Sequence, residues 1–177
     1  MNKRESILES LQSKRSVSDS VYKKIEKFER SLRNSSKEIL VIFDTDGSVL
    51  YKSDGNYHGV EGSHDSKQIG KNKIITHTHP KDVIFSNSDF QEINTYDAIE
   101  MRVVTPNYIY SVKRPSGGWA KALQIFVVDY DRIRSELFLN AIKKGEEPSW
   151  YNNWKDNHFE NEALVRAFGD LVTIKRF

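Results

Sequence analysis

The 177-residue chain contains no cysteine and no long run of apolar residues. Without cysteine there can be no disulfide framework and no thiolate metal site, which agrees with a reducing compartment. A membrane-spanning helix needs about 20 consecutive apolar residues, and no segment approaches that length. The first six residues lead into no apolar region of the kind that a signal peptide requires. We therefore expect a cytoplasmic protein with no membrane partner.

The chain also has little excess of charge of either sign. It carries 27 Lys and Arg against 25 Asp and Glu, and this formal net charge of +2 does not by itself indicate nucleic-acid binding. Up to Ser36, however, nine basic residues stand against five acidic ones. A basic amphipathic helix is most often a solvated surface, so nucleic acid or another acidic partner stays a lesser alternative there.

Local patterns predict helices and strands that fit one domain of this length. We expect helices over residues 3–14, 18–34, 87–96, 119–144 and 153–168, and strands over residues 39–43, 48–52, 74–79, 100–105, 108–113 and 171–175. Residues 53–72, which are rich in Gly, His and Ser, are expected to form a loop. This order predicts an α+β fold with a central mixed or antiparallel sheet flanked by helices.

The two N-terminal helices are expected to form an arm. Within residues 18–34, an apolar stripe recurs at i, i+4, i+7 and i+11, made up of Val21, Ile25, Phe28 and Leu32. Such a stripe must be buried, either on the core of the same chain or by self-association with a second copy. We therefore divide the chain into an arm (residues 1–36), a core (37–114) and a helical C-terminal extension that completes the domain (115–177).

The most informative motif is His77-Thr78-His79-Pro80. The residues before it are rich in β-branched side chains and predict a strand, so both histidines project from the same face. Pro80 lacks an N–H group and ends the strand. Asp89, further along the chain, can return as a third ligand. Two histidines and one carboxylate with an open fourth position are typical of catalytic zinc.

This motif, followed by Phe85-Ser86-x-x-Asp89, resembles that of the JAB/JAMM metallohydrolases, and more closely that of their RadC-like and phage-associated branches. The resemblance covers residues 38–114 and is closest over residues 76–89. The spacing between His79 and Asp89 is one residue shorter than in the isopeptidase members. The resemblance implies a JAB/MPN-like fold and a zinc-dependent hydrolase, phage- or mobile-element-associated, that cleaves an amide or isopeptide bond of a protein or peptide substrate.

The same resemblance implies a role for each residue. His77, His79 and Asp89 would hold one zinc ion, and Ser86 would help to stabilise the oxyanion. In the family a Glu on an upstream strand activates the water. Glu38, which opens the apolar run of residues 38–43, is the candidate for this general base, and Glu61 is the rival candidate.

The Ser-x-x-Asp segment has a second interpretation as a helix capping box. Ser86 would be the N-cap residue and Asp89 the N3 residue, with Phe85 and Phe90 as a hydrophobic staple. The two interpretations are compatible, because a cap fixes where the carboxylate points. Two alternatives for the function also stay open: a metallonuclease that uses the same His/Asp site, and a non-catalytic protein-binding module such as a phage morphogenesis or host-interaction factor.

A rival motif lies in residues 41–50, where Asp44-Thr45-Asp46-Gly47 follows an apolar run. It is similar to the first motif of haloacid-dehalogenase-type phosphohydrolases, in which the first Asp is the nucleophile and the second the acid. That fold needs a helix next and a parallel sheet, so we favour a hairpin turn here. A calcium loop is excluded, because Gly55 stands where that loop requires a Glu.

Overall fold

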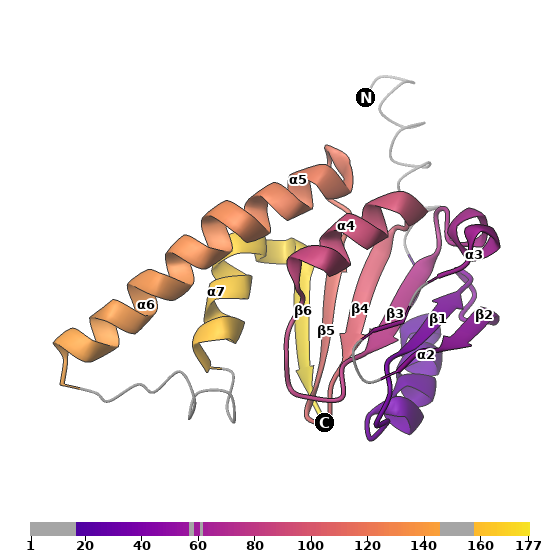
Figure 1. The fold of residues 1–177 in the computed structure, drawn as a ribbon, viewed down its shortest axis with the longest axis horizontal. Coiled ribbons are helices and arrows are strands. Elements are labelled where there is room, and N and C mark those ends of the chain that lie inside the picture. The colour runs from indigo at the N-terminus through magenta and orange to yellow at the C-terminus, as the bar shows by residue number, and fades with distance from the viewer. Residues whose placement is uncertain (1–16, 57–58, 61, 146–157) are drawn as a thin grey trace, which may run out of the picture.

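The computed structural model describes residues 17–56, 59–60, 62–145 and 158–177 (Figure 1). The helices are α2 (Asp19–Leu32), α3 (His64–Ile69), α4 (Asn87–Tyr96), α5 (Gly118–Gln124), α6 (Asp131–Lys143) and α7 (His158–Phe168), with a π-helical segment η1 (Ile125–Tyr130) and a 3-10 segment η3 (Gly169–Leu171). The strands are β1 (Ile39–Phe43), β2 (Val49–Asp54), β3 (Ile74–Thr78), β4 (Glu100–Val104), β5 (Tyr108–Lys113) and β6 (Val172–Arg176).

The strands form one mixed sheet in the order β2-β1-β3-β4-β5-β6. Only β3 and β4 run parallel among these neighbours, and the other four pairs are antiparallel. The parallel pair is joined by a crossover that contains α4, as parallel strands require. The predicted α+β fold with flanking helices is therefore confirmed, and of the two expected kinds of sheet, mixed or antiparallel, the chain has the mixed one.

Helix α2 covers one face of the sheet (Figure 1). Its predicted stripe packs there on β1 and β3, with Ile25 fully buried against Val41, Phe43 and Ile74. Val21, Phe28 and Leu32 of the stripe join the same cluster. The stripe is therefore buried on the sheet of its own chain, and α2 is a layer of the fold. The helix predicted over residues 3–14 lies outside the described residues.

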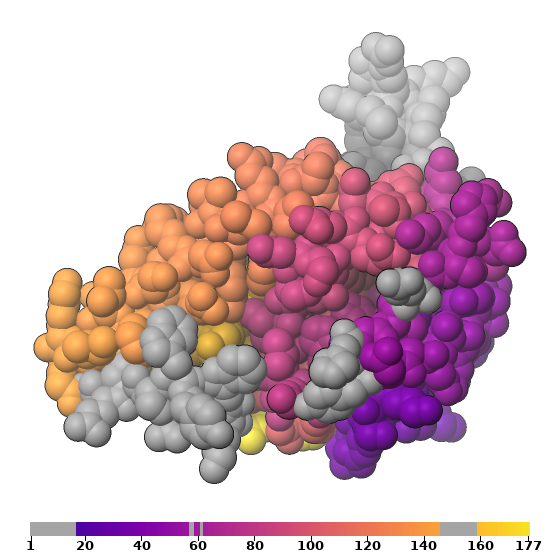
Figure 2. Space-filling model, viewed as in Figure 1, coloured from indigo at the N-terminus to yellow at the C-terminus, as the bar shows by residue number. Residues whose placement is uncertain are grey.

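The opposite face is covered by α4 and by the C-terminal helices (Figure 1). Phe90 of α4 stacks on Phe168 with 5.8 Å between ring centroids, and its centroid lies 4.8 Å from that of Phe126. In the space-filling view the C-terminal helices form one side of this face and the region of β1 and β2 the other, with α4 between them (Figure 2). The C-terminal extension thus shares the core of the sheet.

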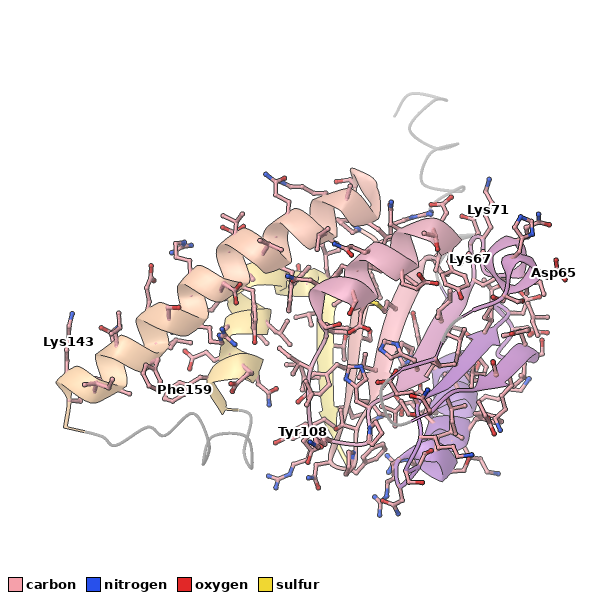
Figure 3. The ribbon with its side chains drawn as sticks, viewed as in Figure 1. Asp65, Lys67, Lys71, Tyr108, Lys143 and Phe159 are labelled. Atoms are coloured by element: carbon pink, nitrogen blue, oxygen red, sulfur yellow. The ribbon has the colours of Figure 1, made fainter. Side chains whose placement is uncertain are left out.

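One local prediction was wrong. The segment expected to be a loop contains the short helix α3, whose N-cap Ser63 accepts a hydrogen bond from the Ser66 N–H group at 3.1 Å. Lys67 connects this helix to α4 through an ion pair with Glu92, 3.3 Å long, and lies at one edge of the molecule (Figure 3). Among the described residues no helix has the length and apolar character needed to span a bilayer.

Candidate metal centre

Strand β3 turns alternate side chains toward α2 and toward α4. Thr76 donates a hydrogen bond to Glu29 on α2 (2.8 Å), and Thr78 donates to the Lys37 carbonyl (2.9 Å). His77 and His79 therefore project together from the other face, as the alternation predicts. His79 stays in the ladder just beyond β3, because its N–H group donates to the Val104 carbonyl at 2.8 Å.

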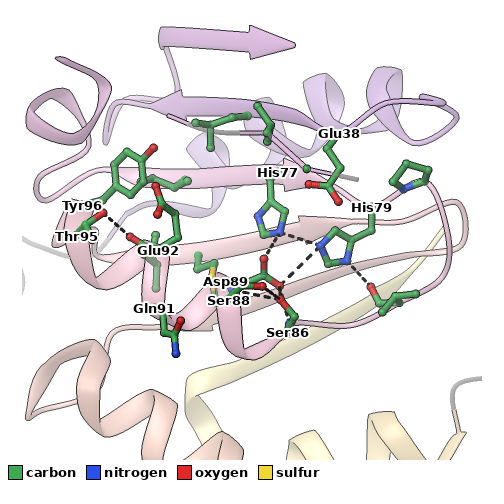
Figure 4. Close-up of a pocket in the computed structure, with 18 of the residues that line it drawn as sticks. Glu38, His77, His79, Ser86, Ser88, Asp89, Gln91, Glu92, Thr95 and Tyr96 are labelled. Carbon is green, nitrogen blue, oxygen red and sulfur yellow. Dashed lines mark hydrogen bonds and ion pairs between the residues drawn. The ribbon is translucent and has the colours of Figure 1, made fainter. Parts of the chain in front are cut away.

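Three candidate ligand atoms converge at this point (Figure 4). The Nε2 atoms of His77 and His79 lie 3.0 Å apart, and those atoms lie 3.1 Å and 3.8 Å from the two carboxylate oxygens of Asp89. Neighbouring ligand atoms of a tetrahedral zinc ion lie about 3.3 Å apart, given metal–ligand distances of about 2.0–2.1 Å. The two nitrogens lie close to this spacing, and one ligand atom from each of the three residues lies within 4.8 Å of the others, which allows the three to share an ion.

Hydrogen bonds behind the cluster fix the donor atoms. The Nδ1 atom of His79 lies 2.7 Å from the Val83 carbonyl oxygen. Because a carbonyl can only accept, Nδ1 carries the hydrogen and Nε2 keeps its lone pair toward the cluster. Asp89 Oδ2 accepts from the N–H and hydroxyl groups of Ser86 (2.6 and 2.8 Å), while Ser86 Oγ accepts from the Asp89 N–H. The capping box is confirmed, and it aims the carboxylate at both histidines.

Burial and charge set the protonation of the cluster. Burial opposes the charged form of His77, but the carboxylate of Asp89, and secondarily that of Glu38, raise its pKa above the ordinary value. Burial and the nearby His77 charge lower the pKa of His79 to about 4. Although burial opposes ionisation of Asp89, the two histidines and the Ser86 N–H group hold its pKa well below its usual range. Of the two imidazoles, His77 is therefore the one whose positive charge the cluster favours, and a metal cation would take the place of that charge.

Glu38 lies on the same face of the sheet as the histidines. Leu40 of β1 is paired with His77, so continuing this antiparallel register places Glu38 opposite His79. Hydrogen bonds of its backbone to Asn56 and Gly55, 2.9 and 2.8 Å long, hold it beside β2. Its carboxylate is directed toward the two imidazoles (Figure 4). The rival base, Glu61, lies outside the described residues.

The cluster forms part of a cavity of about 740 Å³, to which Glu38 and Ser86 also contribute. Helix α4 supplies a wall of this cavity that was not predicted, and the wall includes Glu92 and Tyr96. These residues follow Asp89 by three and seven positions and so share its side of the helix. Helical periodicity could therefore have found them.

The rival motif in residues 44–47 forms the turn of the β1–β2 hairpin. Asp44 makes an ion pair with Lys73 at 2.7 Å, and Asp46 accepts a hydrogen bond from the Ser48 hydroxyl at 2.6 Å. Strand β1 is antiparallel to both of its neighbours and leads into another strand. The parallel sheet and following helix that the phosphohydrolase alternative needs are thus lacking around this motif.

No protein-family model matches this chain, and comparisons with curated proteins and with solved structures found no match either. Over the described parts of the chain, His77, His79 and Asp89 are the one group of three or more potential ligand side chains close enough to share an ion.

Proposed function

We propose that this protein is a zinc-dependent hydrolase of the JAB/JAMM type that cleaves an amide or isopeptide bond in a protein or peptide. The observation that carries the proposal is the convergence of His77, His79 and Asp89 on one point of a cavity that Glu38 also lines. The two histidines come from the β3 region and Asp89 from α4, so the convergence depends on how two separate elements pack together. It is not a property of one short segment.

The donor set favours zinc over the other common divalent cations. Two imidazole nitrogens and one carboxylate suit zinc, whereas magnesium and calcium prefer oxygen ligands throughout. When bound, zinc would polarise the substrate carbonyl and make a water molecule more acidic. The buried position of the cluster keeps bulk water from competing, since the three side chains are only 10%, 11% and 15% exposed.

The residues around the cluster can supply the remaining chemistry. Glu38 would take the proton of the attacking water and return it to the leaving amine, as a general base and then a general acid. Ser86 would donate its hydroxyl hydrogen to the oxyanion. Its hydroxyl now donates to Asp89, and it lies 2.7 Å from the Ser88 hydroxyl, which lines the same cavity. Ser88 is therefore a second candidate for the oxyanion donor.

The charge of the cavity argues against the nuclease alternative. Glu38, Asp89 and Glu92 are acidic groups in its described lining, and Lys81 is the one Lys or Arg there. Phosphodiester substrates carry negative charge and are normally met by Lys and Arg side chains. The acidic groups of the lining would repel a phosphodiester, whereas they do not repel a neutral amide substrate.

A zinc titration of Glu38→Gln against the wild type tests the proposal. Both proteins should bind about one zinc per chain, and the variant should lose at least about a hundredfold in hydrolysis of a peptide library, the usual size of general-base removal. Glu92→Gln is the matched control, because Glu92 lines the same cavity but is paired with Lys67. Absence of zinc binding would refute the metal site, and zinc binding with no hydrolysis would favour a protein-binding module.

A further inference from the structure

Part of the lining of this cavity, beside the metal centre, is formed by largely buried apolar side chains. We call this part of the cavity the apolar slot, and it is lined by Leu40, Val60, Ile75, Ile93, Tyr96 and Met101. Its floor is the sheet: Leu40 is paired with His77, and Ile75 is paired with Met101 of β4. Because Ile75 precedes His77 by two residues, the floor extends about 6–7 Å along β3 from the histidine.

Helix α4 forms the wall of the slot and sets its length. Asp89, Ile93 and Tyr96 stand at i, i+4 and i+7, so they lie on one side of the helix. Seven residues of α-helix rise about 10 Å. The slot therefore begins at the candidate ligand Asp89 and ends about two helical turns away. Figure 4 places Tyr96 at the end of the cavity remote from His79.

The far end is closed by Tyr96, which α3 and its flanking residues hold in place. The Tyr96 hydroxyl lies 3.3 Å from the Ser66 hydroxyl, and Tyr96 itself is 2% exposed. Gly62 and Gly70 flank α3 and approach Tyr96 closely: a Cβ atom at Gly70 would lie 2.5 Å from its ring, and one at Gly62 would overlap its hydroxyl. The depth of the slot is thus limited by a packed residue.

Among the described residues, Glu92 is the one charged side chain of α4 that lines the cavity beyond Asp89. Glu92, at the edge of the cavity, is paired with Lys67 on α3. A charged group entering the slot would lose its hydration without gaining a partner of opposite charge, which is costly. An apolar group would instead bury its surface against the sheet and α4, which is favourable.

We propose that the apolar slot binds a large uncharged apolar side chain, of the size of Leu, Met or Phe, that neighbours the cleaved bond of the substrate. The slot begins at the metal centre and is about one large side chain long, so its occupant must be close to the reacting carbonyl. This inference rests on the proposed function and gives it a substrate class: peptides with a bulky apolar residue beside the scissile bond, in preference to those with a small or an acidic residue.

The first test uses zinc-free protein, so that binding is separated from hydrolysis. The probes are the capped amino acids N-acetyl-phenylalaninamide, N-acetyl-alaninamide and N-acetyl-glutamate amide, titrated in the presence of chelator while the NMR signals of Ile75, Ile93 and Met101 are followed. The phenylalanine probe should bind at least about tenfold more tightly than the other two, because even one methylene in an apolar pocket is worth about tenfold or more. Equal binding of the three probes would overturn the proposal.

Variants at Val60, which is partly exposed and so tolerant of change, locate the binding. Val60→Trp fills the slot and Val60→Asp adds a charge, and each should abolish binding of the phenylalanine probe. Val128→Trp is the control, because Val128 is 56% exposed on η1 and does not line the cavity. Unchanged binding in both Val60 variants would overturn the assignment.

The second test uses zinc-loaded protein and matched peptides with Phe, Leu, Ala or Glu beside the scissile bond. The value of kcat/KM should be on the order of 100-fold higher for Phe and Leu than for Ala and Glu. Hydrolysis without this preference would overturn the slot while leaving the proposed function standing. Apolar probe binding without any hydrolysis would refute the proposed function and support the slot as an apolar binding site.

Discussion

Two buried clusters of ionisable groups lie on opposite sides of strand β3, and only one of them lines the cavity. On the α2 face, the Arg102 guanidinium donates to both carboxylate oxygens of Glu29 (2.7 and 2.9 Å) and to one of Glu100 (2.7 Å). Tyr22 donates to the other oxygen of Glu100, and Thr76 also donates to Glu29. All four carboxylate oxygens therefore have donors within the chain, and none of Glu29, Glu100 and Arg102 lines the cavity of the metal centre.

On the α4 face, neighbouring residues of the same strand behave differently. His77 follows Thr76 directly, yet its Nε2 atom meets another imidazole nitrogen and a carboxylate at the edge of the cavity. Asp89 favours a positive charge on His77, and that charge in turn disfavours one on His79. Buried charge is thus arranged in two ways: the α2-face network joins a helix to the sheet, and the α4-face cluster leaves its nitrogen and oxygen atoms at the cavity.

The largest expected effect is the removal of a ligand from the α4-face cluster. His79→Ala should reduce zinc from about one per chain to none detectable, because supporting partners alone are worth 10–100-fold in affinity and a ligand is worth more. Metal analysis after dialysis against trace zinc would measure this. The control is His64→Ala, since His64 is a highly exposed histidine on α3. Equal zinc loss in both variants would mean that zinc binds elsewhere.

Breaking the α2-face network should instead lower the free energy of unfolding and leave zinc binding intact. Glu29→Ala would leave Arg102, which is 4% exposed, with one carboxylate in place of two. Breaking such buried pairs typically costs about 3–5 kcal/mol of unfolding free energy. Urea unfolding of the zinc-free protein measures this cost. Arg132→Ala is the control, because its pair with Glu136 is exposed and should contribute about 0.3–0.5 kcal/mol. A change in zinc stoichiometry in Glu29→Ala would show that the two faces are coupled.

The sequence predicted those parts of the fold whose signals are local. Strand β1, helix α4 and strand β5 have their predicted boundaries, Ile39–Phe43, Asn87–Tyr96 and Tyr108–Lys113. A β-branched run or a capping box is complete within a few residues, so no distant contact is needed to recognise it. The placement of His77 and His79 on one face followed from strand alternation for the same reason.

The features that escaped prediction depend on contacts between distant residues. Helix α3 has six residues and one large apolar side chain, Ile69, so no periodicity marks it, and it is held by its cap and by Tyr96. The pairing of Glu29 with Arg102 joins residues 73 positions apart. Glu29 stands four residues after Ile25, on the side of the apolar stripe, so helical periodicity turns it toward the sheet, but its partner on β4 is known only once the sheet order is known.

A smaller effect is expected for the residue that supports a ligand from behind. Ser86→Ala removes the cap of α4 and should cost about 1 kcal/mol of unfolding free energy. It also removes the hydroxyl that holds Asp89, so zinc affinity should fall by about 10–100-fold while the stoichiometry stays near one. Chelator competition measures the affinity. Ser88→Ala, which keeps the cap, is the control, and a similar loss there would show that the cap does not orient Asp89.

The smallest effect extends the comparison to a charge pair at the surface. The hydrogen bond from Lys73, together with the Thr45 N–H group, lowers the pKa of Asp44 below its usual value. A carboxyl group with a lowered folded-state pKa stabilises the fold above its unfolded pKa, about 3.9, and loses this contribution as the pH falls through the folded-state value.

Asp44→Asn should therefore lower the unfolding free energy by less than about 1 kcal/mol at pH 7, because the pair is partly exposed. The difference from the wild type should shrink as the pH falls below about 4, where Asp44 of the unfolded chain becomes protonated, and disappear once the pH is below the lowered folded-state pKa. Urea unfolding at pH 7, 4 and 3 measures it, and Asp54→Asn, in a more exposed pair with Lys52, is the control. Because Asp44 lies in a hairpin turn remote from the cavity lining, hydrolysis should be unchanged. A strong loss of activity in Asp44→Asn with wild-type stability would revive the phosphohydrolase alternative.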